Sequence, residues 1–344
     1  MSRIVPVVST AVLSLALAGA AHAADYMNGM RGSLPPSWTN EDNGLDPVGI
    51  EMGLRYWYSM GSQSLNTTAG DFTSTDKTHI LEGHLRIDDY STNTFATANV
   101  GYSVAISGDY DTPSGTGSVA GGQVGYAGAD LGWMAFGDPN NGLGIGALAG
   151  YQYWNDSPDM GRVDYYNIGS ASDVTWSSAD GSYSVTGASV ANNVDIHTLR
   201  LGIAARANLG FMDIDGYLAA IPFAKVTGTI GAAGFSPVVL NATDTLYPTS
   251  PVSIDGMAYG AAAQLMVGFH PTDNLTLRLG ARAQYLTGST NATYSTAVVT
   301  APQDVNPPDG TYEPPTVATQ SYIETNRPFE IMRLGALAEL SWAF

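Results

Sequence analysis

The sequence has 344 residues, a formal net charge of −18 at pH 7 and no cysteine. This acidic balance argues against a nucleic-acid partner, because phosphate binding needs basic patches, and the lack of cysteine excludes a disulfide framework. Charged residues make up only 13% of the chain, against about 25% in typical globular domains. A low charge without one compact apolar stretch favours apolar residues spread by alternation along strands.

The N-terminus has the pattern of a secretion signal. Arg3 precedes an apolar stretch over 4–20, and Ala21-His22-Ala23 forms a small-x-small cleavage site. We therefore expect a signal peptide over 1–23, cleaved after Ala23; an N-terminal transmembrane helix fits less well because the run is short. No later run is long enough for a spanning helix. The polar segment 24–46 is expected to be a periplasmic tail or a short plug, followed by a barrel over 47–344.

Alternation of apolar and polar residues with period two predicts the strands. It is clearest over 275–285, where Leu277 and Leu279 share one face while Arg278 and Arg282 share the other. The pattern predicts an all-β fold, a transmembrane antiparallel up-and-down β-barrel of ten strands. The expected strands are 47–60, 77–90, 94–107, 121–137, 143–155, 193–208, 211–226, 256–270, 273–288 and 327–344. The fourth changes phase and the seventh contains Pro222.

Short and long connections alternate along these strands. Short turns are expected at 91–93, 138–142, 209–210 and 270–274, and longer segments at 61–76, 108–120, 156–192, 227–255 and 289–326. Short inner turns and long outer loops are typical of outer-membrane barrels, and an even strand count places both ends in the periplasm. The loop 156–192 has room for a hairpin around 174–188. If both arms of that hairpin cross the membrane, the barrel has twelve strands.

The C-terminus ends on an alternating aromatic pattern. Phe344 follows Trp342 and Leu340 at every second position, and this resembles the C-terminal signal of bacterial outer-membrane β-barrels. The resemblance implies recognition by the barrel assembly machinery and a location in the bacterial outer membrane, with outer-membrane lipid and lipopolysaccharide as contacts.

A second resemblance, to the ten-stranded omptin proteases, is restricted to short segments. Similar stretches are Leu143-Gly144, Ala149-Gly150-Tyr151-Gln152 and the acidic Asp109-Tyr110-Asp111. The omptin Asp/His pair of the fourth outer loop has no counterpart, since 227–255 contains no histidine, and the Trp-x-Asp-x-Ser-x-His-Pro element is absent. The resemblance therefore implies architecture without the omptin catalytic motifs.

The polar faces of the expected strands place charges in the lumen. We expect them to form cross-strand pairs of arginine with carboxylate, because an unpaired buried charge is costly. The principal network residues are Glu51, Arg55, Glu82, Arg86, Arg200, Arg206, Arg278, Arg282, Arg333 and Glu339, and further candidates are Asp88, Asp130, Asp213, Asp215 and Lys225. Such pairs either fill the lumen of a narrow barrel or line a narrow pore.

Other candidate sites are weaker. His79 and His84 fall on opposite faces of one strand, so we expect no metal site, and no motif indicates a cofactor. Asp195 and His197 share a strand face near the outer rim, but no nucleophile accompanies them, so no enzymatic activity is expected. The outer loops are rich in acid. We expect a structural or surface-interaction protein whose outer loops contact an external ligand; the alternatives are a narrow channel for small solutes or ions and an omptin-like rim hydrolase.

Overall fold

The computed structural model describes residues 48–68, 70–112, 115–139, 142–230, 236–272, 274–304 and 310–344. The expected signal peptide over 1–23 and the tail or plug over 24–46 lie outside the described residues. Within the described residues, no helix is long and apolar enough to cross a membrane.

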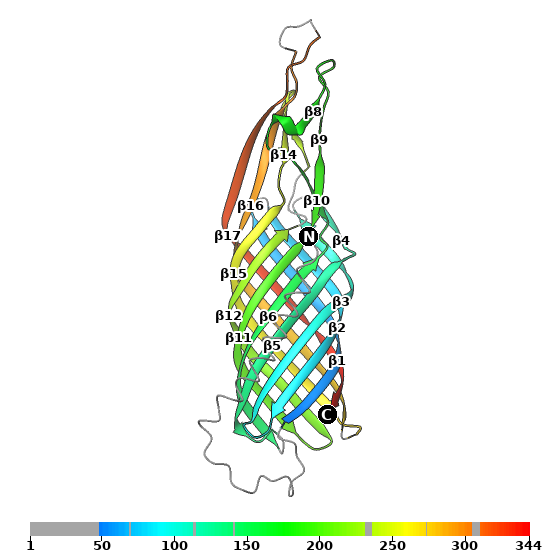
Figure 1. Cartoon of the computed structure of the whole chain (residues 1–344), viewed down its shortest axis with the longest axis vertical. Helices are drawn as coiled ribbons and strands as arrows, with labels where there is room; N and C mark the ends of the chain where they lie inside the picture. Colours follow the sequence, from blue (N-terminus) through cyan, green and yellow to red (C-terminus); the bar gives the residue numbers. More distant parts are fainter. Residues whose placement is uncertain are drawn as a thin grey trace.

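Ten long strands form one closed antiparallel ring (Figure 1). Each strand pairs with its neighbour in the chain, and the last strand returns to pair with the first, from Glu51↔Ala343 to Leu65↔Phe329. The prediction of a ten-stranded antiparallel barrel is therefore confirmed. The strands are β1 (Val48–Thr67), β2 (Gly70–Asp89), β3 (Thr94–Thr112), β5 (Gly122–Gly137), β6 (Leu143–Pro158), β11 (Asn193–Asn208), β12 (Met212–Ile230), β15 (Val252–Phe269), β16 (Leu275–Thr300) and β17 (Thr316–Ala343).

The side chains alternate between an apolar exterior and a buried interior. On β16, Leu277 and Leu279 face outward, the latter 69% exposed, whereas Arg278 and Arg282 face inward and are buried. Leu340 and Trp342 are also exposed on the outer surface of β17. A barrel in lipid needs an apolar belt of this kind, because its outer surface contacts hydrocarbon over a band about 25 Å tall. The structure is therefore that of a transmembrane β-barrel.

Several strands are longer than expected. β1 and β2 reach Thr67 and Gly70, so most of the expected loop 61–76 is paired strand. In the same way β16 and β17 extend into the expected loop 289–326. These extensions are rich in Ser and Thr, which pair well across strands, and apart from Tyr322 and Ile323 they have few of the outward apolar residues by which the membrane strands were recognised.

β-Bulges explain the two irregular strands. The pairing register of β5 with β6 shifts between Trp133 and Phe136, which accounts for the change of phase in the fourth expected strand. The register of β12 with β15 shifts between Ile221 and Ala224, and Pro222 lies within that shift. A bulge tolerates proline because it interrupts the ladder of backbone hydrogen bonds in any case.

The long loop 156–192 adds no strand to the barrel, so the twelve-stranded alternative is wrong. Its short strands pair only with one another and lie beyond the outer end of the barrel (Figure 1). The short outer elements are β4 (Gly115–Val119), β7 (Arg162–Tyr166), a 3-10 turn (Ala171–Asp173), β8 (Val174–Trp176), β9 (Tyr183–Val185), β10 (Gly187–Ala191), β13 (Val238–Val239) and β14 (Asp244–Pro248).

Candidate functional site

The charged residues of the lumen form several connected groups, beginning near the end of the barrel at which the short turns lie. There, Arg86 Nη1 lies 2.9 Å from Asp215 Oδ2, and Arg86 Nε lies 2.9 Å from Asp88 Oδ2. Arg206 Nη1 is 3.1 Å from the same oxygen of Asp88. Two arginines and two aspartates thus form an alternating chain that joins β2, β11 and β12 across the lumen.

Arg278 of β16 is the centre of a second group, adjacent to the first. Its Nη2 lies 2.9 Å from Asp213 Oδ2 and its Nη1 lies 2.7 Å from Glu339 Oε1. The same guanidinium also donates to Glu51, while Glu339 accepts a second hydrogen bond from Arg55. One arginine therefore connects carboxylates from β12, β17 and β1, which ties distant strands of the ring together.

Glu82 of β2 is the centre of a third group. Its Oε1 lies 2.9 Å from Arg55 Nη1, its Oε2 lies 2.6 Å from Arg282 Nη1, and the Tyr126 hydroxyl donates to it as well. The Arg282 guanidinium stacks on aromatic rings, 5.1 Å from the Trp57 ring centre and 5.7 Å from that of Tyr126. A fully buried carboxylate is tolerated here because two arginines and a hydroxyl satisfy its oxygens.

Arg200 and Asp130 form a separate pair on the same inward face, with Nη2 2.8 Å from Oδ1. All ten of the principal network residues predicted from the sequence point inward in the structure. Asp88, Asp130, Asp213 and Asp215 join them as predicted. We call the charged side chains from Arg86 and Asp215 up to Glu82 and Arg282 the inner network.

A small cavity lies within the inner network. Glu51, His84, Arg86, Asp130 and Tyr217 are among its lining residues. Its volume is about 50 Å³, and one water needs roughly 10–15 Å³ on this measure. It therefore has room for a few water molecules, whereas ligand sites are about 300–1,000 Å³.

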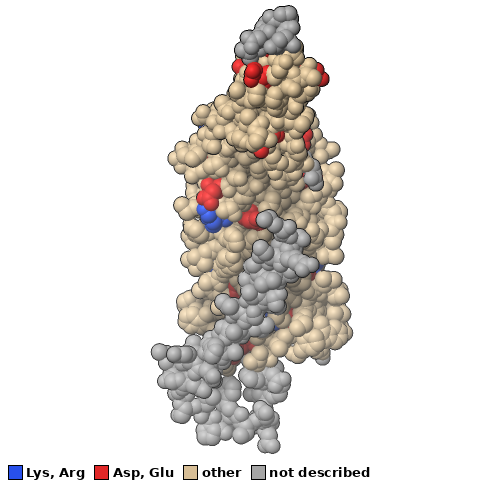
Figure 2. Space-filling model, turned by 45° about the horizontal axis from the view of Figure 1, so that its top comes forward, with Lys and Arg blue, Asp and Glu red and all other residues tan. Residues whose placement is uncertain are grey.

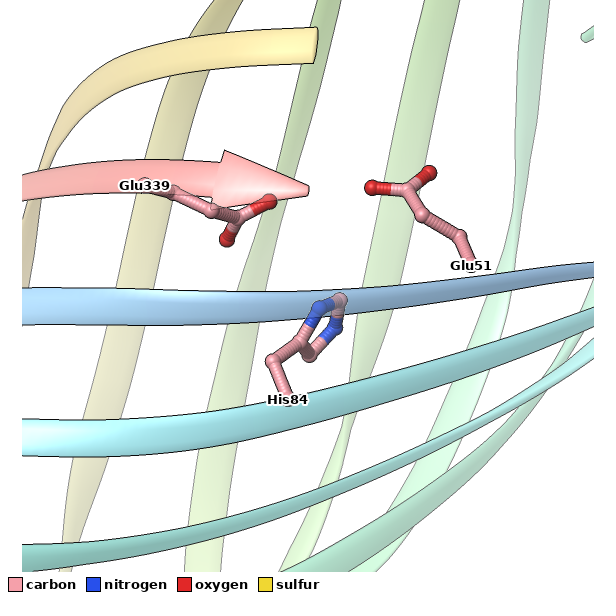
Figure 3. A group of neighbouring side chains, drawn as sticks. All are labelled: Glu51, His84 and Glu339. Carbon is pink, nitrogen blue, oxygen red and sulfur yellow. The ribbon is translucent and has the colours of Figure 1, made fainter. Parts of the chain in front are cut away.

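Three side chains beside this cavity have the composition of a metal site. Glu51, His84 and Glu339 come from β1, β2 and β17, and their side chains approach one another (Figure 3). One ligand atom of each lies within 4.8 Å of the other two. Both carboxylates, however, already accept hydrogen bonds from Arg278. We therefore assign this group to the inner network. His79 faces outward on the same strand, so the two histidines of β2 lie on opposite faces as predicted.

A single arginine occupies the next level outward. Arg333 is 1% exposed; its Nη1 lies 2.8 Å from Asp76 Oδ1 and its Nη2 lies 2.9 Å from Asp156 Oδ1. Gly61 faces this group, and a Cβ there would lie 2.5 Å from Arg333 Nη2. The absence of a side chain at Gly61 thus makes the space that the guanidinium occupies.

Beyond Arg333 the interior is mainly apolar, although Gln63 and Ser74 are buried at the level of Ile331. Phe329 and Ile331 follow it outward on alternate positions of β17, and Ile331 pairs with Leu286 while Phe329 pairs with Leu65. Each of these side chains is at most 1% exposed. Further buried apolar residues of this region are Phe72, Val194, Ile196, Val226, Ile230, Val252 and Ile254. We call this set, with the four residues above, the outer plug.

The sequence prediction placed one lumen residue on the wrong face and missed three. Lys225 faces outward, where its Nζ lies 2.6 Å from Asp255 Oδ1; the bulge after Ile221 reverses the phase of β12. Asp76 and Asp156 were missed because each lies one residue beyond an expected strand, 77–90 or 143–155. Continuing the alternation by one step would have found both. Tyr126 could not be identified from the sequence, because tyrosine occurs on both the inward and the outward faces of barrel strands.

Asp195 and His197 share an outward face near the outer rim, as predicted. Each is hydrogen-bonded to a tyrosine of β6, since the Tyr153 hydroxyl lies 2.5 Å from Asp195 Oδ1 and the Tyr151 hydroxyl lies 2.6 Å from His197 Nδ1. The two side chains are thus held by separate tyrosines on the membrane-facing side.

The outer loops form an ordered unit above the barrel, which we call the outer module: residues 159–192, 236–251 and 295–323 as far as they are described. It has a small apolar core of Ile168, Val174, Tyr247, Ala297 and Val299. The Tyr183 hydroxyl lies 3.4 Å from that of Tyr247, which links the loop 156–192 to β14. These loops are therefore packed against one another.

Hydrogen bonds also order two acidic turns of the outer module. Backbone N–H groups of Gly169 and Ser170 donate to Asp173 and hold the pKa of its carboxyl below the usual range. The side chains of Asn241 and Thr300 do the same for the pKa of Asp244. Both carboxylates thus act as turn acceptors in addition to carrying charge.

Similarity to known proteins is low throughout. No protein-family model and no curated protein matches the chain. Among solved structures, the Pseudomonas putida toluene transporter TodX has 10% identity and a TM-score of 0.29, with 87% of this chain and 91% of that chain covered. The translocator domain of the autotransporter NalP from Neisseria meningitidis has 11% identity and a TM-score of 0.35, with 95% and 98% covered. The beta domain of the Bordetella autotransporter BrkA has 11% identity and a TM-score of 0.31, with 87% and 99% covered. Likenesses this low carry no argument about the ligands or solutes of the chain.

Proposed function

We propose that this protein is an outer-membrane barrel that does not conduct, and that it holds the outer module at the cell surface for contact with external partners. The observation that carries the proposal is the outer plug. Its apolar side chains come from several strands around the ring and are buried inside the barrel, so they occupy the space through which a solute would have to pass.

The inner network supports the same function. Its arginines and carboxylates bond to one another at 2.6–3.1 Å, so they neutralise and position each other. A ten-stranded barrel is close in size to the eight-stranded barrels whose interior is filled by side chains. An ion entering from the periplasmic side would have to break these pairs and then cross an apolar layer that water wets poorly.

The outer module supports a role at the surface. Ordering a loop costs about 1–2 kcal/mol per residue in backbone entropy, and here a small apolar core offsets part of that cost. Ordered loops on a rigid barrel are a common arrangement for binding, because the scaffold fixes the positions of the contacting side chains. The module has acidic residues in several of its turns, and Figure 2 shows acidic side chains near the outer end of the molecule.

Single-channel conductance of the refolded mature protein in a planar bilayer tests the proposal. We expect no steady openings from a barrel whose folding is verified by heat-dependent mobility on a gel. A double variant, Leu286→Ala with Phe329→Ala, opens the plug and serves as the matched comparison, in which we expect openings. Steady, ion-selective openings of the unaltered protein would overturn the proposal.

A narrow channel is the second candidate function, and the cavity beside Glu51 and Arg86 favours it. This cavity is lined by charges and has room for a few waters. If the unaltered protein conducts, Arg278→Ala and Arg282→Ala would identify the constriction through their effect on ion selectivity.

A further inference from the structure

Two similar clusters of tyrosine and histidine lie on the outward face of the barrel. On β1 and β2, Tyr56 and Tyr58 flank His79, with ring centres 5.9 and 5.2 Å from that of the histidine. The Tyr56 hydroxyl is hydrogen-bonded to His79 Nδ1. We call this group, together with Lys77, the β1–β2 rim cluster.

The second cluster repeats the arrangement on β6 and β11. Tyr151 and Tyr153 flank His197, with ring centres 6.1 and 5.2 Å from the histidine. We call this group, together with Lys225, the β6–β11 rim cluster. In both clusters a Tyr-x-Tyr segment of an outgoing strand faces a histidine of the next barrel strand.

Both clusters lie at the same height. Tyr58 is ten positions beyond Val48, the first residue of β1, and Tyr153 is ten positions beyond Leu143, the first residue of β6. Ten residues of a tilted strand span about 25 Å, which equals the height of the apolar band of a membrane barrel. The clusters therefore lie where the apolar band ends and the headgroups of the outer leaflet begin.

The only two lysines of the whole sequence belong to these clusters. Lys77 lies two residues from His79 on the same outward face of β2. Lys225 of β12 is the direct cross-strand partner of His197. A chain of net charge −18 thus places both of its lysines at the rim, while seven of its arginines lie inside the barrel.

The two lysines differ in their partners. Lys225 is paired with Asp255 at 2.6 Å, and Asp195 lies beside it, two residues from His197. Lys77 is exposed and makes no ion pair within the described residues. Asp109 of β3 occupies the same register position relative to Lys77 as Asp255 does relative to Lys225, but within the described residues no ion pair joins it to Lys77. The lysine of the β1–β2 rim cluster is therefore not engaged by a carboxylate, whereas the lysine of the β6–β11 rim cluster is.

We propose that the β1–β2 rim cluster binds a phosphate group of an outer-leaflet lipid headgroup. The Lys77 ammonium supplies the charge, the tyrosine hydroxyls and the imidazole supply hydrogen-bond donors, and the tyrosine rings pack on the adjacent acyl chain. The inference rests on the membrane placement in the proposed function and is independent of whether the lumen conducts. The β6–β11 rim cluster has the same aromatic frame but binds no phosphate, because Asp255 neutralises its lysine.

Titration of the refolded barrel in detergent with bisphosphorylated lipid A, followed by native mass spectrometry, tests this site. We expect Lys77→Ala to weaken binding at least tenfold and Lys77→Arg to retain it within about threefold, since arginine also binds phosphate. Lys225→Ala is the matched control and should change binding less than twofold. Tyr285→Ala is a second control, because Tyr285 also lies ten positions beyond the start of its strand but pairs with Ala261 and Met332.

Two further measurements distinguish binding of the whole lipid from binding of its phosphate group alone. Lipid A from which both phosphates have been removed should bind the unaltered protein as weakly as intact lipid A binds the Lys77→Ala variant. Inorganic phosphate should bind much more weakly than the lipid, because it lacks the acyl contact. Equal loss in the Lys77→Ala and Lys225→Ala variants, or no loss on removal of the phosphates, would overturn the proposal, as would inorganic phosphate binding as tightly as lipid A.

Discussion

The inner network and the outer plug occupy the same lumen but fill it in different ways. In the inner network, arginines and carboxylates share partners, so that Asp88 contacts Arg86 and Arg206 while Glu82 contacts Arg55 and Arg282. Beyond it, Arg333 is the one cation bonded to both Asp76 and Asp156 among the described residues, and it lies beneath a mainly apolar layer. Charge pairs therefore connect the strands across the lumen, whereas apolar packing closes it.

The surroundings of each charge decide how much it contributes. A buried charge that loses its partner is costly because water cannot replace the lost hydrogen bonds. Near the short-turn end a cavity with room for waters adjoins Arg86 and Arg206, and a second arginine is close to each acid. Around Arg333 neither compensation exists within the described residues. The same substitution should therefore have very different effects in the two regions.

The largest effect is expected for Arg333→Ala. It leaves the buried carboxylates of Asp76 and Asp156 facing each other without a cation, and we expect the free energy of unfolding to fall by about 5 kcal/mol. The measurement is reversible urea unfolding of the refolded barrel in lipid vesicles. A loss below about 1 kcal/mol would show that the two aspartates are reached by water, which would contradict the seal assigned to the outer plug.

The next largest effect is expected for Phe329→Ala, which removes a fully buried ring from the outer plug. Substitutions of this kind cost about 3–5 kcal/mol, and we expect about 3 kcal/mol here because leucine and isoleucine neighbours can relax into part of the space. Phe211→Ala is the matched control, since Phe211 is 67% exposed near an inner turn. Similar losses for both variants in the same unfolding assay would mean that the plug is no better packed than the surface.

The smallest effect is expected for Arg206→Ala. Its partner Asp88 keeps the hydrogen bonds from Arg86 Nε, and water from the adjacent cavity can replace the rest, so we expect a loss of about 1 kcal/mol. The variant should be compared directly with Arg333→Ala by the urea midpoints of the two proteins. A loss as large as that of Arg333→Ala would remove the distinction between the two regions.

The contrast also shows where sequence patterns are informative. Over 275–285 the alternation is strict, and the structure places Leu277, Leu279, Arg278 and Arg282 on the predicted faces. The same rule was wrong for Lys225, because a bulge adds residues to one strand and reverses the phase of every later residue in that strand. It stopped short of Asp76 and Asp156, because the outward residues beyond the membrane are no longer apolar.

The amino-acid pattern by itself determined the fold class, favoured ten strands and identified most of the inward charges, because a strand in lipid must show an apolar face at every second position. Only the tertiary structure decided which arginine meets which carboxylate, since Arg278 and Arg333 each reach strands far apart in the chain. It also decided that the outer half of the lumen is mainly apolar. In that half the outward side chains face water and the inward side chains are packed, so the apolar residues lie on the inward face. The period-two alternation is the same as in the membrane strands. Periodicity alone therefore does not tell which face is inward.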